Sequence, residues 1–143
     1  MVAEKIKTIV YIDDHEQDIK LLQRVIEREL KNINLITYND SETAIEQIMD
    51  GTLSQYNPSL LFIDIKMPKI SGFDILQTLR QDKNYQTVPK IVLSSSAQKS
   101  DIKQAFDLSC NSYIAKPTSF PKFKETIIYA ITYWLSYNLR LND

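Results

Sequence analysis

Three aspartates stand directly after short apolar runs of the sequence. Asp13 and Asp14 follow one such run, and Asp64 follows the run of residues 60–63. Runs of this length are typical of buried strands, and an ionised carboxylate is costly to bury without a partner. Neighbouring carboxylates also repel one another, and a divalent cation would relieve both costs. Oxygen ligands suit Mg²⁺, which keeps several waters and usually takes one or two carboxylates.

Two further polar side chains end later apolar runs. Ser94 ends the fourth run and Lys116 follows the fifth. A carboxylate beside Mg²⁺, faced by a hydroxyl and a lysine, is suited to phosphoryl transfer with the aspartate as nucleophile. The cation, the ammonium group and the hydroxyl would offset charge on the phosphoryl oxygens.

The elements that must position these side chains alternate along the chain. Each strand candidate is followed by apolar residues at helical spacing, and the candidates cover residues 8–13, 35–38, 60–63, 90–93 and 113–115. This alternation predicts an α/β fold with a doubly wound, five-stranded parallel sheet. Ligands of such folds bind beyond the carboxyl ends of the strands, where all of these polar residues fall.

Some local features are also predicted from sequence. Asn39 and Glu42 have capping-box spacing at the start of the second helix. Residues 51–58 and 81–88 are expected to be loops. In the last helix, one face is expected to pack on the core through Phe120, Phe123, Ile127, Ile131 and Trp134.

The composition restricts the classes of function. The formal net charge of −1 gives no general attraction to nucleic acid or to an anionic membrane. The single cysteine, Cys110, allows no internal disulfide, and we expect it to be a small buried hydrophobe. Two glycines are too few for a glycine-rich phosphate loop. No apolar stretch resembles a signal peptide or spans a bilayer, so we expect a cytoplasmic protein.

Taken together, the sequence resembles the response-regulator receiver domain of bacterial two-component systems. The residues that carry the resemblance are Asp13, Asp14, Asp64, Met67, Pro68, Gly72, Ser94, Tyr113, Lys116 and Pro117. They stand in the order of the family and close to its spacings. The resemblance implies a single receiver domain over residues 1–143, with a core of about 6–138. It also implies a flavodoxin-like (βα)5 fold with strand order 2-1-3-4-5.

The resemblance further implies a role for each matching acid. Asp64 would accept a phosphoryl group from a phosphohistidine on a sensor histidine kinase. Asp14 and Asp64 would bind Mg²⁺ directly, together with the backbone carbonyl of Lys66, and Mn²⁺ could substitute. Asp13 would act through a metal-bound water. Such a protein catalyses only its own phosphorylation and dephosphorylation and is not otherwise an enzyme.

The same resemblance implies a conformational switch. Lys116 would pair with the aspartyl phosphate, and Ser94 would move inward to hydrogen-bond to it. Tyr113 would then change rotamer and alter the surface of the fourth helix, fifth strand and fifth helix. The Lys116–Pro117 peptide is expected to be cis. Ser109 and Cys110 stand where the family often has Gly-Ala, which leaves the turn before the fifth strand open.

Tyrosines of the last helix form a second stripe. Tyr129, Tyr133 and Tyr137 recur every four residues. Two interpretations stay open: a solvated face of a monomer, or a protein–protein interface, where tyrosine is enriched. The C-terminal part also resembles single-domain regulators that accompany bacterial phytochromes. Those tend to pair through the fourth helix, fifth strand and fifth helix, which would make a phytochrome-type kinase and a second copy candidate partners.

The favoured interpretation is a phosphorylated stand-alone receiver with no output domain in this sequence. Such a receiver would act by binding partners or by relaying the phosphoryl group to a histidine phosphotransfer protein. Two other hypotheses compete with it. One is a phosphatase of the haloacid-dehalogenase class, but that class normally has a second acid where this sequence has Lys66. Another is a degenerate receiver that only scaffolds. His15 follows the acid pair, and an exposed first-turn histidine is favoured over a metal ligand because no second histidine is present.

Overall fold

One parallel sheet organises the computed structural model, which describes residues 5–141. The strand order is β2-β1-β3-β4-β5, as predicted. The strands are β1 (Lys7–Ile12), β2 (Ile33–Tyr38), β3 (Pro58–Ile63), β4 (Lys90–Ser94) and β5 (Ser112–Ala115). The predicted α/β fold is therefore confirmed.

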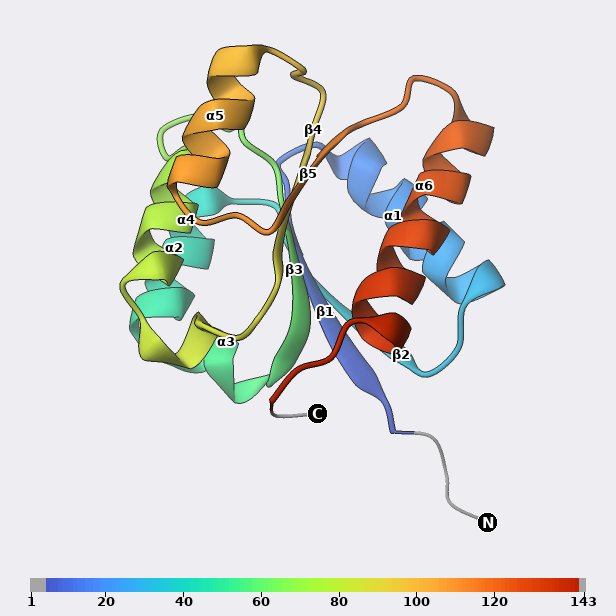
Figure 1. Cartoon of the computed structure of the whole chain (residues 1–143), viewed down its shortest axis with the longest axis horizontal. Helices are drawn as coiled ribbons and strands as arrows, with labels where there is room; N and C mark the ends of the chain where they lie inside the picture. The colour runs from blue at the N-terminus through green and yellow to red at the C-terminus, as the bar shows by residue number, and fades with distance from the viewer. Residues whose placement is uncertain (1–4, 142–143) are drawn as a thin grey trace.

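Helices cover both faces of the sheet (Figure 1). One face carries α1 (Glu16–Glu29) and α6 (Phe120–Thr132). The other carries α2 (Ser41–Met49), α4 (Gly72–Arg80) and α5 (Lys99–Asp107). Short turns complete the chain: α3 (Thr52–Gln55), η1 (Lys83–Tyr85) and the π-helical turn η2 (Tyr133–Tyr137).

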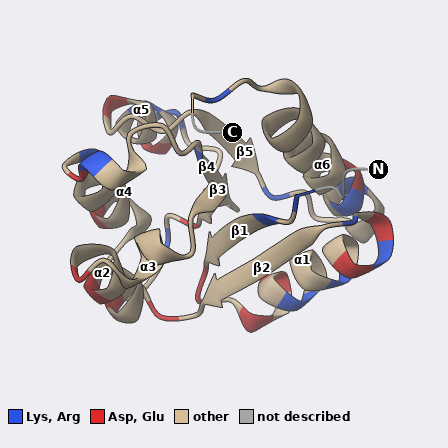
Figure 2. Ribbon diagram, turned by 90° about the horizontal axis from the view of Figure 1, so that it is seen from below, with Lys and Arg blue, Asp and Glu red and all other residues tan. Residues whose placement is uncertain are grey.

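The sheet separates two apolar cores because strand side chains alternate between its faces. Val10 and Ile63 belong to the core under α2, α4 and α5. Tyr11 and Phe62 belong to the core under α1 and α6, where their rings meet edge to face at 6.2 Å. Every residue of β3 is buried, as expected for the central strand of a parallel sheet. Figure 2 shows the contrast, with charges on the outer helices and none on β3.

Polar side chains cap the N-termini of several helices. The side chain of Asp40 caps α2 by accepting from the Glu42 N–H, so the predicted Asn39 cap was wrong by one residue. The Asn39 amide donates instead to Glu16 at 2.6 Å. Ser71 and Asp74 form a reciprocal capping box at the start of α4.

Several predictions on loops and faces are corrected. The two expected loops contain α3 and η1. The expected core residue Phe120 is exposed, because it is the first residue of α6 and lies beyond the edge of the packed face. Phe123, Ile127 and Ile131 are buried as predicted, and Trp134 is half-buried.

The turn before β5, where the family often has Gly-Ala, contains Ser109 and Cys110 in this chain. Ser109 has a φ of 71°, a left-handed conformation that glycine adopts at least cost. The turn thus keeps a backbone suited to glycine and accepts the cost of a Cβ atom. Cys110 is buried as expected, and burial raises the pKa of its thiol to about 11.

None of the helices within residues 5–141 is both long and apolar enough to span a bilayer.

Candidate functional site

The acidic residues are held at the carboxyl edge of the sheet by strand pairing. The Asp13 N–H donates to the Tyr38 carbonyl at 3.0 Å, and the Asp64 N–H donates to the Ile12 carbonyl at 2.9 Å. The ladder therefore continues one residue beyond β1 and β3. Because these bonds fix the main chain, both carboxylates have defined positions before any ligand arrives.

Lys116 brings the fifth strand into the same cluster. Its Nζ lies 2.6 Å from Asp13 Oδ2, 2.8 Å from Asp18 Oδ2 and 3.7 Å from Asp64 Oδ1. Only 8% of the Lys116 side chain is exposed. Burial acts to lower the pKa of Lys116, but the ion pairs with Asp13 and Asp18 outweigh it and raise the pKa. The lysine is therefore a fixed positive charge, and it sits closer to Asp13 than to Asp64.

Asp13 has its carboxylate oxygens occupied by the protein itself. Oδ2 accepts from the Tyr11 hydroxyl at 2.5 Å as well as from Lys116. Oδ1 accepts from the His15 backbone N–H at 2.8 Å, and the His15 ring nitrogen Nδ1 lies equally near. Tyr11 is buried, and burial followed by the charge of Asp13 raises the pKa of its phenol. Asp13 is thus the most completely hydrogen-bonded of the three acids.

Asp14 and Asp64 differ from Asp13 in this respect. Among residues 5–141, no group donates a hydrogen bond to Asp14 Oδ1 or Asp64 Oδ2, although both atoms are buried. Asp64 is only 1% exposed. Burial, and then the charge of Asp13, raises the pKa of Asp64 to about 6. Two buried oxygens that accept no hydrogen bond can be satisfied as ligands of a hard cation such as Mg²⁺.

His15 lies beside the same oxygens. Its Nδ1 is 3.3 Å from Asp14 Oδ1 and 3.5 Å from Asp64 Oδ2. The hydrogen bond to Asp13 raises the pKa of His15. The side chain is 52% exposed, so the expected exposure is confirmed, and its ring nitrogen Nδ1 lies within the acid cluster.

The predicted switch residues lie on the neighbouring strands. Ser94 is the last residue of β4 and is fully buried, and its Oγ accepts from the Ser96 N–H at 3.2 Å. The Tyr113 hydroxyl donates to the Ser96 carbonyl at 2.9 Å. The β4–α5 loop therefore connects Ser94 to Tyr113 through Ser96.

A second contact holds that loop to the β3–α4 segment. The Ser96 hydroxyl donates to Asp101 Oδ2 at 2.5 Å, and Lys66 Nζ lies 3.3 Å from the same oxygen. The Ser96 hydrogen bond and Lys66 together lower the pKa of Asp101. Lys66 follows the acid by two residues, so this contact ties the segment after Asp64 to the start of α5.

Gly72 allows the main chain to pack against Asp64. A Cβ atom at this position would lie 2.1 Å from the Asp64 carbonyl oxygen and 2.8 Å from the Ile65 Cα. The Gly72 N–H donates to the Ile65 carbonyl at 2.9 Å. Gly72 is one of the residues that carry the family resemblance, and this close approach is the physical reason for a glycine there.

The prediction of a cis bond between Lys116 and Pro117 was wrong. All peptide bonds in residues 5–141 are trans. The trans form is the more stable isomer of an X–Pro bond by about 0.5–1 kcal/mol.

Comparison with known proteins decides the family. A family model for the response regulator receiver domain matches residues 9–128. This chain belongs to that family. The receiver is 28% identical over 121 residues to the polar-differentiation response regulator DivK of Brucella ovis, covering 85% of this chain and 93% of DivK.

Two solved structures share the fold of this receiver. The phosphorylated cyanobacterial phytochrome response regulator RcpA has a TM-score of 0.86 at 24% identity. The Mn²⁺-bound form of response regulator Rcp1 has a TM-score of 0.81 at 22% identity. In each comparison the matched part covers 94% of this chain and 98% of the other chain. The similarity to these two structures is one of fold.

Two residues of the receiver's site were missed from sequence. Tyr11 lies inside an apolar strand and gave no signal apart from its hydroxyl. Asp18 stands three residues after the N-cap His15, in the first turn of α1, which begins at the same edge of the sheet. That spacing was available as a signal, but its partner Lys116 lies 98 residues away along the chain.

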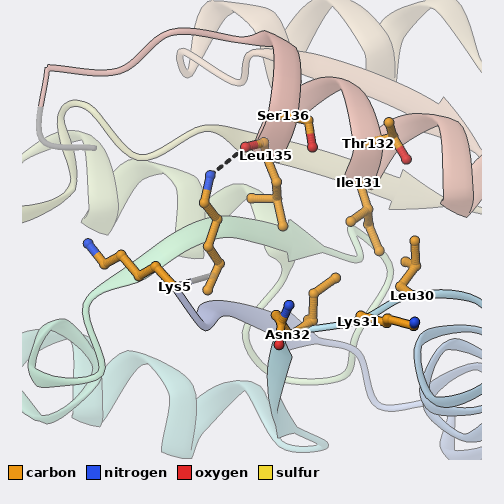
Figure 3. Close-up of a pocket in the computed structure, with 10 residues that line it drawn as sticks. Lys5, Leu30, Lys31, Asn32, Ile131, Thr132, Leu135 and Ser136 are labelled. Carbon is orange, nitrogen blue, oxygen red and sulfur yellow. Dashed lines mark hydrogen bonds between the residues drawn. The ribbon is translucent and has the colours of Figure 1, made fainter. Parts of the chain in front are cut away.

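A cavity of about 470 Å³ lies at the other end of the receiver's sheet, between the start of β1 and the end of α6 (Figure 3). Lys5, Lys7 and Lys31 contribute its positive charge. Lys7 Nζ donates to the Leu135 carbonyl in η2 at 2.5 Å, as drawn in Figure 3. This contact satisfies a carbonyl at the end of a helix, where cations are stabilising. Lys7 therefore helps to dock η2 against the start of β1, away from the acidic edge.

Proposed function

We propose that Asp64 accepts a phosphoryl group from a phosphohistidine on a sensor histidine kinase, in a Mg²⁺-dependent reaction. The observation that carries this proposal is the Asp64 carboxylate, buried, without a hydrogen-bond donor on Oδ2 among residues 5–141, and 3.7 Å from Lys116 through Oδ1. Because little solvent competes for a carboxylate held in this way, its oxygens keep lone pairs available, one oxygen for a cation and the other for phosphorus.

The residues present fit a divalent cation. Asp14 and Asp64 would bind it directly through their undonated oxygens, with the Lys66 carbonyl as a further ligand. Asp13 would contribute through water, which agrees with the occupation of both its oxygens by Tyr11, His15 and Lys116. Mn²⁺ is expected to substitute for Mg²⁺. The cation supplies charge neutralisation at the phosphoryl oxygens.

The transfer itself exchanges one bond for another. A carboxylate oxygen of Asp64 forms the new P–O bond as the P–N bond to the donor histidine breaks, and the imidazole leaves with that electron pair. Lys116 neutralises a phosphoryl oxygen by moving from Asp13 toward Asp64. The Ser94 hydroxyl donates a hydrogen bond to another oxygen. Lys116 and Ser94 would thus stabilise the negative charge on the phosphoryl oxygens, which is the main contribution a protein makes to phosphoryl transfer.

The output of the proposed switch is a change of surface. Ser94 would move inward to the phosphoryl group, and Ser96, in the loop that follows it, is hydrogen-bonded to Tyr113 and Asp101. Movement of Ser94 would therefore release or re-form the Tyr113 bond. The surface concerned comprises α5, β5 and α6, which are the fourth helix, fifth strand and fifth helix of the sequence prediction because the short α3 takes a number of its own. Phe106, Tyr129 and Tyr133 are exposed on these elements.

The partners follow from that surface and from the phosphoryl donor. A sensor histidine kinase, a phytochrome-type kinase among them, or a histidine phosphotransfer protein would supply or receive the group in the cytoplasm. A second copy could pair through the surface carrying Tyr129, Tyr133 and Tyr137. The proposal treats residues 1–143 as one receiver domain with a core of about 6–138, supported by the single sheet from Lys7 to Ala115.

Phosphorylation by acetyl phosphate in Mg²⁺ tests the acceptor. Asp64→Asn should abolish labelling, measured by intact-protein mass spectrometry. Asp107→Asn is the matched control, because the Asp107 side chain is exposed and pairs with Lys103 on the same helix. Labelling that persists in Asp64→Asn would place the acceptor elsewhere. Steady turnover of small phosphoesters would favour the haloacid-dehalogenase hypothesis, and no labelling of the wild type would favour a scaffold.

A further inference from the structure

His15 places a ring nitrogen among the oxygens of the acid cluster. Nδ1 is 2.8 Å from Asp13 Oδ1, 3.3 Å from Asp14 Oδ1 and 3.5 Å from Asp64 Oδ2. The last two oxygens are buried and receive no hydrogen bond from any residue between 5 and 141. The imidazole thus lies next to the two buried carboxylate oxygens that a cation would neutralise, Asp14 Oδ1 and Asp64 Oδ2.

The spacing of these three atoms suits one metal ion. An octahedral ion with bonds of about 2.1 Å keeps adjacent ligand atoms roughly 3 Å apart. The distances from Nδ1 to the oxygens of Asp14 and Asp64, 3.3 and 3.5 Å, need to close only slightly to reach that value. These two nitrogen–oxygen distances allow the imidazole to take a position next to either carboxylate oxygen around one ion, and the candidate ligand atoms of Asp13, Asp14, His15 and Asp64 all lie within 4.8 Å of one another.

The main chain holds His15 in place for this role. Its backbone N–H donates to Asp13 Oδ1 at 2.8 Å, and the residue is the N-cap of α1. Coordination through Nδ1 would give up the ring's hydrogen bond to Asp13. Asp13 would still be bound by Tyr11 and Lys116, so the loss leaves no carboxylate without a partner.

We propose that His15 is a nitrogen ligand of the divalent cation at this edge, and that it shifts the preference of the site from Mg²⁺ toward Mn²⁺ and later transition metals. The inference rests on the proposed metal site of Asp14 and Asp64. Its chemical basis is that imidazole suits transition metals, whereas Mg²⁺ prefers oxygen ligands and binds nitrogen weakly.

The single histidine of the chain makes a direct test feasible. Mn²⁺ bound to the full chain, without a histidine tag at pH 8, is examined by pulsed electron paramagnetic resonance. The wild type should show modulation from imidazole nitrogen. Selective labelling with ¹⁵N-histidine should change that modulation, and His15→Ala should remove it. Because only one residue carries the label, any such signal identifies His15.

Calorimetric titration supplies a second readout. His15→Ala should weaken Mn²⁺ binding about tenfold and leave Mg²⁺ binding within about twofold, because only the transition ion gains from a nitrogen ligand. Gln17→Ala is the matched control, since Gln17 is exposed on the same turn of α1. Circular dichroism melting checks that each variant is folded, and the half-exposed His15 side chain is expected to contribute little to stability.

The outcomes separate the inference from the proposed function. Mn²⁺ that binds to the wild type without a histidine nitrogen signal overturns the role of His15 and leaves the carboxylate site intact. Equal loss of Mg²⁺ and Mn²⁺ affinity in His15→Ala also overturns the claimed preference. A wild type that binds neither ion removes the metal site of the proposed function, and this inference with it.

Discussion

Replacing Asp64 by asparagine is expected to stabilise the metal-free protein. Burial, and then the charge of Asp13, raises the pKa of Asp64 to about 6, whereas an aspartate in an unfolded chain titrates near 3.9. Each tenfold difference in acidity is about 1.4 kcal/mol, so keeping Asp64 ionised costs the fold up to about 3 kcal/mol at neutral pH. The asparagine side chain would have the same size without the charge, and Lys116 would keep its partners Asp13 and Asp18.

The pH dependence of this gain has a definite sign. Well below pH 4, Asp64 is protonated in both the folded and the unfolded chain, so its ionisation costs nothing. As the pH rises from 4 to 6, the unfolded chain loses its proton first, and the wild type loses stability relative to Asp64→Asn. The gain from the substitution should therefore be about 1 kcal/mol near pH 4.5 and rise to about 3 kcal/mol at pH 8.

Urea unfolding in EDTA measures this gain at both pH values, with Asp107→Asn as the control for loss of one surface charge. Saturating Mg²⁺ should narrow the gap at pH 8, because the ion binds the folded wild type and adds about 2.7 kcal/mol at a concentration of 100 times its Kd. An Asp64→Asn protein no more stable than the wild type at pH 8 would refute the reasoning. So would a gain of the same size at pH 4.5.

Three further substitutions test other contacts in the site, and a fourth tests the tyrosine surface. Gly72→Ala would place a Cβ 2.1 Å from the Asp64 carbonyl oxygen, so urea unfolding should show a loss of about 3 kcal/mol together with slower labelling by acetyl phosphate; unchanged stability would mean that α4 moves freely. Asp18→Asn removes the 2.8 Å ion pair with Lys116, and because Asp18 is partly exposed the loss should be about 1 kcal/mol; a gain would contradict the pairing. Lys116→Ala should keep Mg²⁺ binding by calorimetry but impair labelling by the kinase, and lost binding would show a structural role. Tyr133→Glu should lower the sedimentation coefficient if the exposed tyrosines form an interface, and an unchanged profile would remove that proposal.

Most of the fold could be predicted because its signals are local. A buried strand of a parallel sheet requires an apolar run, and a helix that covers it requires apolar residues every three or four positions, so alternation along the chain reveals both. Errors arose where several local solutions have similar free energies. Asp40 and Asn39 are both good caps, and α3 and η1 are single turns that loops of the same length could replace.

The types of side chain that reach the edge of the sheet follow from the order of residues along the chain. Parallel strands end together, so acids after β1 and β3, a serine at the end of β4 and a lysine after β5 must converge wherever the helices lie. How those groups pair with one another depends on the packing of the elements in three dimensions. Lys116 hydrogen-bonds to Asp13 and Asp18 and lies farther, at 3.7 Å, from Asp64. The ring nitrogen of His15 lies near Asp14 and Asp64. Such distances depend on the packing of β1, β5 and α1 against one another, because contacts between residues about 100 positions apart have no periodic signal along the chain.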